Sequence, residues 1–312
     1  MSELHKFLFD GLPVRGQVVR LTDSWRDLLA RRGDTPYPEP VRDLLGEMTA
    51  AAVLMQSNIK FDGKLIFQAH GDGPLTLAVA EVGADLRFRA TATVVGAVPE
   101  AADLQSLLNA NGQGRCVITL DPEQRGKGQQ PYQGVVSLGA DGQESTSVAH
   151  MLEHYMKQSE QLDSRLVLAA DGQVAAGLLL QRMPVQGHAN LGEREGSPDD
   201  DFRRLAMLAA TLTRDELLTL DADTLLRRLF WQAPPRRLVT LHPRFACSCS
   251  HQRVSSMLRG LGRDEVDSIV AEQGQVDIGC EFCGQRYRFD AIDAAAVFAA
   301  VVAQPPGPAS VN

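Results

Sequence analysis

The stretch that decides the C-terminal part of the fold is residues 245–251, FACSCSH, read together with residues 279–284, GCEFCG. These two segments place Cys247, Cys249, Cys280 and Cys283 in a CxC-x30-CxxC pattern. Two close pairs of thiols are the ligand set of a closed tetrahedral Zn²⁺ site that has no open position for a catalytic water. The spacing therefore predicts a small C-terminal zinc-binding domain with one Zn²⁺ per chain, held by these four cysteines.

The local sequence suits such a site at both pairs. In an extended segment, residues two apart point to the same side, so Cys247 and Cys249 can reach one ion. Gly284 directly follows Cys283, and glycine permits the positive φ angle of a tight turn around a metal.

Two interpretations of the cysteines remain open at this point. In the first, the metal is purely structural, in a zinc-ribbon module that binds nucleic acid or a protein partner. In the second, the electron-rich thiolates are oxidisable, and the CxC pair is an unusual way to build a merely structural site. Structural zinc supplies roughly 10–16 kcal/mol of apparent binding energy, which so small a domain cannot replace from its core. Oxidation would then release the metal and unfold the domain.

Charge argues against a nucleic-acid or anionic-membrane surface. The 312-residue chain has a formal net charge of −8, and such partners are held mainly by clustered Lys and Arg. Residues 240–290 also contain more acidic residues than arginines, so they have no net basic footprint. We expect no nucleic-acid partner.

The beginning of the chain, MSELHKFLFDGLPVRG, lacks the apolar region of a signal peptide. No apolar run approaches the roughly 20 residues that span a bilayer. These features predict a cytoplasmic protein without a membrane partner. In that reducing compartment, clustered cysteines are more often metal ligands or redox sensors than structural disulfides.

Residues 1–182 are predicted to form an α+β core domain, in which helices flank an antiparallel sheet. A Leu- and Ala-rich stretch predicts a helix over 43–60, and residues 147–158 are a second candidate. Alternation and β-branched or aromatic residues predict strands over 64–68, 75–82, 86–95, 116–120 and 134–138. Asp171-Gly172 is predicted to turn a hairpin within residues 165–181.

Residues 183–239 are predicted to form a helical, redox-sensitive linker. A Gly-rich polar stretch over 187–200 precedes two amphipathic helices over 201–231, and Pro234-Pro235 ends them. Two such helices cannot cover their apolar stripes on each other, so we expect them to pack on another domain. If uncovered, these apolar side chains are predicted to form an interaction surface that contains Phe202, Leu205, Leu208, Leu226 and Phe230. The zinc-binding domain is predicted over 240–300, followed by a disordered tail over 301–312.

Several stretches of the chain together resemble one known family. They are FACSCS, DEVDSIVAEQGQVDIGCEFCGQRYRFD, LFDGLPVRGQVV, KFDGKLIFQAHGDGPLTLAV and YQGVVSL. Through them nearly the whole chain resembles the 33 kDa chaperonin family, the redox-regulated heat-shock holdases of bacteria.

The resemblance implies an ATP-independent chaperone that is inactive while Cys247, Cys249, Cys280 and Cys283 hold zinc. Oxidation under unfolding conditions would form Cys247–Cys249 and Cys280–Cys283 disulfides, release zinc, unfold the C-terminal domain and destabilise the linker. The oxidised form would be a homodimer and the reduced form a monomer. The oxidised form would bind unfolding client proteins through the uncovered linker surface, prevent their aggregation and pass them to ATP-dependent foldases.

Two further features are expected to lie outside this function. Cys116, within RCVITL, is predicted to be a buried and inert thiol. His150, Glu153 and His154 match the H-x-x-E-H pattern of a zinc protease, but so short a pattern arises easily by chance and no third ligand is evident. A hydrolytic zinc enzyme is therefore the weakest alternative, and we expect no enzymatic activity.

Overall fold

The structure is a computed structural model that describes residues 1–33, 35–123, 130–138, 147–184 and 198–299. By their internal contacts, the residues divide between Ala246 and Cys247 into two compact units, here called the N-terminal and C-terminal units. Helices combine with largely antiparallel sheets, which confirms the predicted α+β class.

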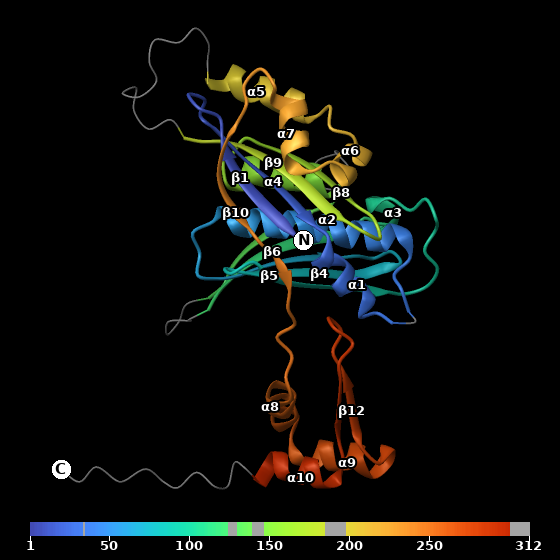
Figure 1. The fold of residues 1–312 in the computed structure, drawn as a ribbon. Helices are drawn as coiled ribbons and strands as arrows, with labels where there is room; N and C mark the ends of the chain where they lie inside the picture. The colour runs from blue at the N-terminus through green and yellow to red at the C-terminus, as the bar shows by residue number, and fades with distance from the viewer. Residues whose placement is uncertain (34, 124–129, 139–146, 185–197, 300–312) are drawn as a thin grey trace, which may run out of the picture. The chain divides into compact units, whose positions relative to one another are not determined.

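The N-terminal unit contains two sheets, where the sequence predicted one (Figure 1). The five-stranded sheet has the order β10-β1-β2-β9-β8, and all its neighbours are antiparallel. Its strands are β1 (Glu3–Leu8), β2 (Val14–Leu21), β8 (Ser164–Ala170), β9 (Ala175–Arg182) and β10 (Arg236–Leu241). The predicted hairpin around Asp171 is the β8–β9 pair.

The six-stranded sheet has the order β11-β5-β4-β3-β6-β7 and is antiparallel except for the β11–β5 pair. Its strands are β3 (Gly63–His70), β4 (Leu75–Gly83), β5 (Arg87–Val94), β6 (Arg115–Pro122), β7 (Tyr132–Ser137) and β11 (Arg244–Phe245). All five strands predicted in this region are present, with ends shifted by a few residues. Two short helices accompany these strands, α1 (Asp23–Ala30) and α3 (Leu104–Leu108).

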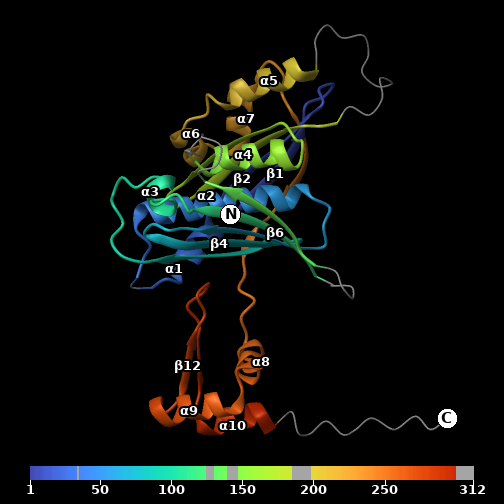
Figure 2. The ribbon, with the colours of Figure 1, turned by 180° about the vertical axis from the view of Figure 1, so that it is seen from behind.

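The central helix α2 (Glu39–Asn58) lies between the two sheets and contacts strands of both (Figure 1). Its Ala- and Leu-rich sequence leaves most of it buried, as expected for a helix covered on several sides. Gly46 allows a close approach to β8, because a Cβ there would lie 2.4 Å from the Cβ of Ala170. Helix α4 (Val148–Ser159) begins at the cap Ser147 and packs beside α2 and against β8 (Figure 2).

The predicted linker region contains three helices, where the sequence predicted two. They are α5 (Pro198–Ala209), α6 (Arg214–Thr219) and α7 (Ala222–Phe230). Thr213 forms a capping box with Glu216, and Asp221 caps α7, which explains why the amphipathic stretch breaks into short helices. Their apolar side chains share one buried cluster with β1, β2 and β9.

The five-stranded sheet is therefore buried on both faces over its central strands. On β2, Val18 belongs to the cluster under α5–α7, whereas Val19 belongs to the cluster around α2. Leu178 and Leu179 of β9 divide in the same way. Burial on both faces explains why β9 is a continuous apolar run rather than an alternating one.

The C-terminal unit is a small α+β unit with its own core. It consists of α8 (His251–Leu261), α9 (Arg263–Gln273), β12 (Val276–Gly279), β13 (Arg286–Phe289) and α10 (Ala291–Ala299), with β12 and β13 paired antiparallel. The unit begins after β10, which crosses the predicted boundary at 239/240 and pairs with β1 of the N-terminal unit. The domain boundaries at 182/183 and 239/240 stay predictions, and the tail over 301–312 lies outside the described residues.

Candidate metal centre

The first cysteine pair lies immediately before α8. Cys247 and Cys249 precede Ser250, whose hydroxyl caps the helix by accepting from the N–H of Arg253 at 3.2 Å. Because the helix cannot begin before its cap, the two cysteines remain in a non-helical segment. Both thiols are partly buried.

The second pair lies in the turn between β12 and β13. The N–H groups of Cys283 and Gly284 donate to the carbonyl of Cys280 at 3.3 and 2.8 Å, and the N–H of Cys280 donates to the carbonyl of Gln285 at 2.9 Å. Gly284 has φ 67°, which confirms the predicted need for glycine at this turn. The hairpin therefore directs two thiols toward one point.

The four thiols converge. Their Sγ atoms all lie within 4.8 Å of one another, with Cys247 to Cys280 at 3.6 Å and Cys249 to Cys283 at 3.3 Å. Tetrahedral zinc with Zn–S bonds of about 2.3 Å requires sulfurs about 3.8 Å apart. The donor set and its spacing therefore suit one zinc ion. Both of these contacts join the CxC pair to the CxxC pair.

The cluster favours at least one thiolate. Burial raises the pKa of Cys247, but hydrogen bonds from the Cys249 backbone and from the neighbouring thiols outweigh it and lower the pKa to about 7. Burial raises the pKa of both Cys280 and Cys283. The sulfurs hydrogen-bond to one another through their thiol protons. A bound metal ion would replace these protons, so that all four sulfurs could be thiolates.

Tyr287 is a neighbour of the centre that the sequence analysis did not identify. Its hydroxyl donates to Sγ of Cys249 at 3.1 Å from strand β13. Residues that donate to metal-bound sulfurs orient the ligands and reduce the electron density on the sulfur. The pairing of β12 with β13 places Tyr287 there, so the cysteine spacing alone contained no signal for it.

The other sequence-predicted residues lie elsewhere. Cys116 is 1% exposed in β6, and burial raises its thiol pKa to about 12, which agrees with an inert thiol. His150, Glu153 and His154 line a surface hollow with Phe202, and the Glu153 carboxylate accepts from the N–H of Leu166 at 2.7 Å. Over the part of the chain that the structure describes, the four cysteines are the only group of three or more His, Cys, Asp or Glu side chains placed closely enough to hold one metal ion.

The predicted client-binding side chains are mostly covered. Leu205, Leu226 and Phe230 are buried, and Phe202 is partly buried against the same cluster. Leu208 is the exception, at 36% exposed.

Among the described residues, no helix combines the length and apolar character needed to cross a membrane.

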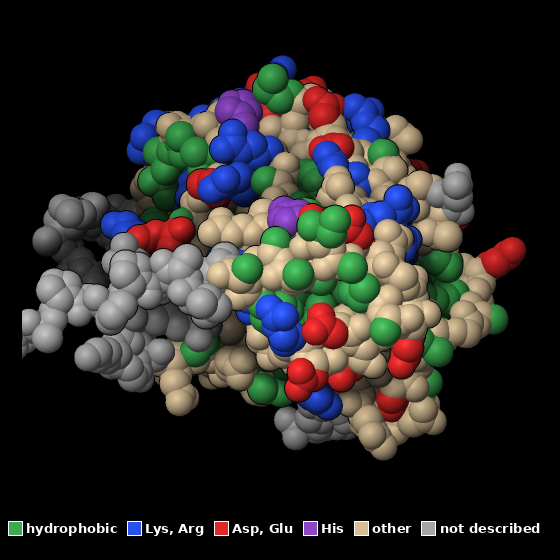
Figure 3. All heavy atoms as spheres, turned by 90° about the horizontal axis from the view of Figure 1, so that it is seen from below, with side chains coloured by type: hydrophobic (Ala, Val, Ile, Leu, Met, Phe, Trp, Pro, Cys, Tyr) green, Lys and Arg blue, Asp and Glu red, His purple; other side chains and the backbone are tan. Residues whose placement is uncertain are grey.

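Charge on the surface is mixed. Figure 3 shows Lys and Arg side chains with Asp and Glu side chains among them on the face that it draws. In the C-terminal unit, Arg286 and Arg288 both pair with Asp277, at 2.9 and 3.4 Å. Asp277 thus partly neutralises these two arginines.

Comparisons with known proteins agree along almost the whole chain. The family model described as "Hsp33 protein" matches residues 2–290. The "33 kDa chaperonin" of Chromobacterium violaceum is 47% identical over 297 residues, which cover 95% of this chain and 94% of the relative. That of Methylobacillus flagellatus is 41% identical over 305 residues and covers 97% of each chain.

A solved structure shares the fold. The crystal structure of the 33 kDa chaperonin (heat shock protein 33 homolog) from Thermotoga maritima matches with a TM-score of 0.77. The match covers 97% of this chain and 99% of the other, at 18% sequence identity. At that identity, the likeness concerns the fold alone.

Proposed function

This chain belongs to the Hsp33 protein family, and from that membership we propose that it is a redox-regulated, ATP-independent holdase chaperone. It binds unfolding proteins and prevents their aggregation under oxidative stress. The observation that carries the proposal is the convergence of four oxidisable thiols on one point of a small unit. We propose no catalytic role for the chain.

In the resting state, Cys247, Cys249, Cys280 and Cys283 hold one Zn²⁺. The fit of the donor set supports this assignment, because four sulfurs within 4.8 Å of one another match a closed tetrahedral site. When bound, zinc keeps the sulfurs as thiolates and ties the segment before α8 to the β12–β13 turn. Tyr287 orients Cys249 through its hydroxyl.

Oxidation removes these ligands. Each pair of thiols loses two electrons and two protons to one hydrogen peroxide, which becomes two waters as a disulfide forms. The proposed pairs are Cys247–Cys249 and Cys280–Cys283, which the short sequence separations support. Cross-pairs of Cys247 with Cys280 and of Cys249 with Cys283 are the alternative, since those sulfurs are 3.6 and 3.3 Å apart.

Loss of the metal should unfold the C-terminal unit. The unit has a small core, formed by Val254, Leu258, Val266, Val276, Phe289, Ala294 and Val297. A core of this size stabilises a unit by only a few kcal/mol at most. Zinc binding is worth roughly 10–16 kcal/mol, so its loss exceeds what the core supplies.

The linker helices supply the proposed client-binding surface. In the structure, α5–α7 cover one face of the five-stranded sheet, and Phe230 stacks edge-on against Phe9 with ring centroids 5.0 Å apart. Arg20 of β2 donates to the carbonyls of Leu217 and Leu220 at the end of α6. Release of these helices would uncover a contiguous apolar surface of the kind that marks an interaction site.

The proposed partners follow from this surface. Unfolded or partly folded proteins would bind it, and ATP-dependent foldases would receive them afterwards. We propose a monomer when reduced, a homodimer when oxidised, and a cytoplasmic location, where the resting thiols stay reduced.

The test uses the full chain, reduced and loaded with zinc. Peroxide at heat-shock temperature should release one zinc per chain, consume the four thiols of the cluster, and suppress the light scattering of a thermally unfolding client. Mass spectrometry of the unreduced protein would distinguish the two disulfide pairings.

The Cys116→Ala variant is the matched control, because its thiol is buried away from the cluster and should leave every readout unchanged. Zinc release without any suppression of aggregation would refute the chaperone proposal. A purely structural zinc module that binds a protein or nucleic acid would then be the better assignment.

A further inference from the structure

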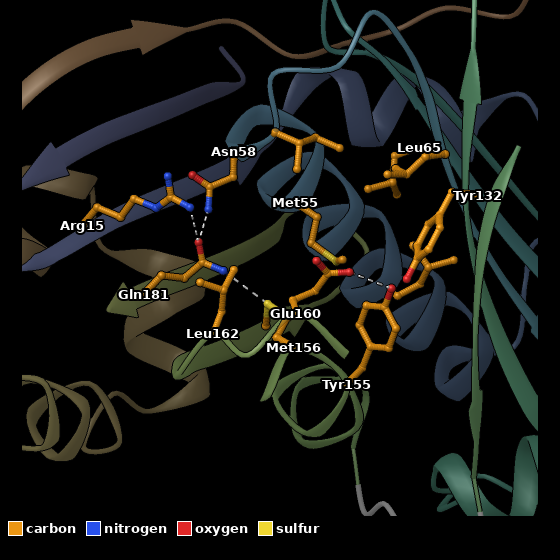
Figure 4. A pocket seen from close by; sticks show the side chains of 13 residues that line it. Arg15, Met55, Asn58, Leu65, Tyr132, Tyr155, Met156, Glu160, Leu162 and Gln181 are labelled. Carbon is orange, nitrogen blue, oxygen red and sulfur yellow. Dashed lines mark hydrogen bonds between the residues drawn. The ribbon is translucent and has the colours of Figure 1, made fainter. Parts of the chain in front are cut away.

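A pocket that encloses about 110 Å³ lies within the N-terminal unit and has no part in the redox proposal (Figure 4). Small-molecule sites usually enclose about 300–1,000 Å³, so this smaller pocket suits a slender ligand. Residues from both sheets line it, together with the end of α2 and residues of α4. The packing of segments that are distant in the sequence therefore forms this pocket.

The walls of the pocket are mainly apolar. They include Met55 and Met156, which are flexible and adapt to the shape of a ligand. The remaining apolar wall residues are Ile59, Leu65, Ile118, Leu120 and Leu162. Tyr132, at 52% exposed, and the exposed Glu160 line the pocket where it meets solvent.

One end of the pocket carries an arginine without a carboxylate. Nη2 of Arg15 donates to Oε1 of Gln181 at 2.9 Å, and Asn58 donates to the same oxygen (Figure 4). Gln181 is buried and neutral, so it positions the guanidinium without cancelling its charge. The Nε atom of Arg15 is buried and has no hydrogen-bond partner among the described residues.

A second cation lies near Arg15. Burial and the charge of Arg15 both lower the pKa of Lys6, which donates to the carbonyl of Ser57. The carboxylate that lines the pocket, Glu160, accepts instead from the Tyr155 hydroxyl at 3.3 Å. Although the chain has a net charge of −8, this end of the pocket is positive.

We propose that the pocket binds an amphipathic carboxylate of the medium-chain fatty-acid class, with its head group on Arg15 and its chain between Met55, Leu65 and Met156. The apolar walls favour an alkyl chain, which gains about 25 cal/mol per Å² of buried apolar surface. The guanidinium has donors left for a carboxylate, which it binds more strongly than a neutral group.

The test is calorimetric titration of the full, reduced chain with decanoate below its micelle concentration, with 1-decanol as the uncharged analogue. We expect saturable binding of one decanoate per chain, in clear preference to decanol. Arg15→Gln should weaken decanoate binding about tenfold or more, since hydrogen bonds to charged groups are worth about 1.5–3 kcal/mol, and should leave decanol unaffected.

Two further variants separate the pocket from other apolar surfaces. Leu162→Trp, at a partly exposed position of the wall, should block both ligands, whereas Arg26→Gln, at an exposed arginine of α1, should change nothing. Absence of saturable decanoate binding, or equal losses in the Arg15 and Arg26 variants, would overturn the proposal. So would binding of many decanoates that Leu162→Trp leaves intact, because that result indicates a general apolar surface.

Discussion

Cysteine and glycine positions in the candidate metal centre show how far single residues can be interpreted from spacing. The CxC and CxxC pairs predicted four converging thiols, and Gly284 predicted a turn with positive φ, because both features depend on neighbours within a few positions. Tyr287 was missed, since its contact with Cys249 crosses from one hairpin strand to a segment 38 residues away.

Glu47 on α2 is a residue whose behaviour depends on its surroundings. Burial, and then the charge of Asp43, raise its pKa to about 7, against the opposing effect of Arg214. A folded pKa above the unfolded value of 4.5 means that the folded state holds the proton more tightly. This contribution to stability is fully present below about pH 4.5 and is lost as the pH rises through about 7.

We therefore expect Glu47→Gln to stabilise the protein above pH 7. One pKa unit corresponds to about 1.4 kcal/mol, so the shift from 4.5 to about 7 should give a gain in the free energy of unfolding of roughly 3 kcal/mol at pH 8, and this gain should vanish near pH 4.5. Urea denaturation at both pH values measures it. Glu39→Gln, at an exposed position of the same helix, is the control, and an equal gain there would contradict the explanation.

At the scale of elements, the sequence was most informative where one face of a segment is buried. The alternating strands β3 to β7 and the Ala-rich helix α2 were predicted near their observed positions. The sequence pattern predicts no strand at the positions of β1, β2 or β10. Most side chains of β10 are exposed, so it has no alternating pattern, and β2 is buried on both faces. Pairing with neighbours defines these strands, and pairing is not visible in a single segment.

The linker helices allow a stability test at the scale of an element. Phe230→Ala removes a side chain that is 1% exposed and packs on Phe9, so it should lower the free energy of unfolding by about 3–5 kcal/mol. Leu208→Ala, at a 36% exposed position of α5, should change it by less than about 0.5 kcal/mol.

Urea denaturation followed by the fluorescence of the buried Trp25 measures both variants. Under the proposed function, reduced Phe230→Ala protein should also suppress client aggregation in part, because α7 is held less firmly on the sheet. Equal stability losses in the two variants would show that α5–α7 do not pack as described.

At the scale of the whole molecule, the chain consists of two units with unequal cores. The N-terminal unit has two large buried clusters on either side of the five-stranded sheet, whereas the C-terminal unit has one small cluster. This asymmetry predicts that the two units respond differently to loss of the metal.

We expect a strong chelator under reducing conditions to unfold the C-terminal unit while the N-terminal unit stays folded. Hydrogen exchange should become fast over residues 247–299, and the fluorescence of Trp25 should stay unchanged, because that residue lies in the N-terminal unit. Restoring zinc should reverse the change. Slow exchange over 247–299 after complete zinc removal would show that the small core is sufficient by itself.

Spacing along the chain was enough to predict the four converging thiols, the turn glycine, the alternating strands and the amphipathic helical stretch after residue 200, because those features depend on a few neighbouring residues. The tertiary structure decided that there are two sheets rather than one, and that α5–α7 pack on the outer face of the five-stranded sheet. It also decided that Tyr287 reaches Cys249 and that Arg15 borders an apolar pocket. Each of these features depends on which segments, distant in the sequence, pack against one another. Those contacts form only when the complete chain folds.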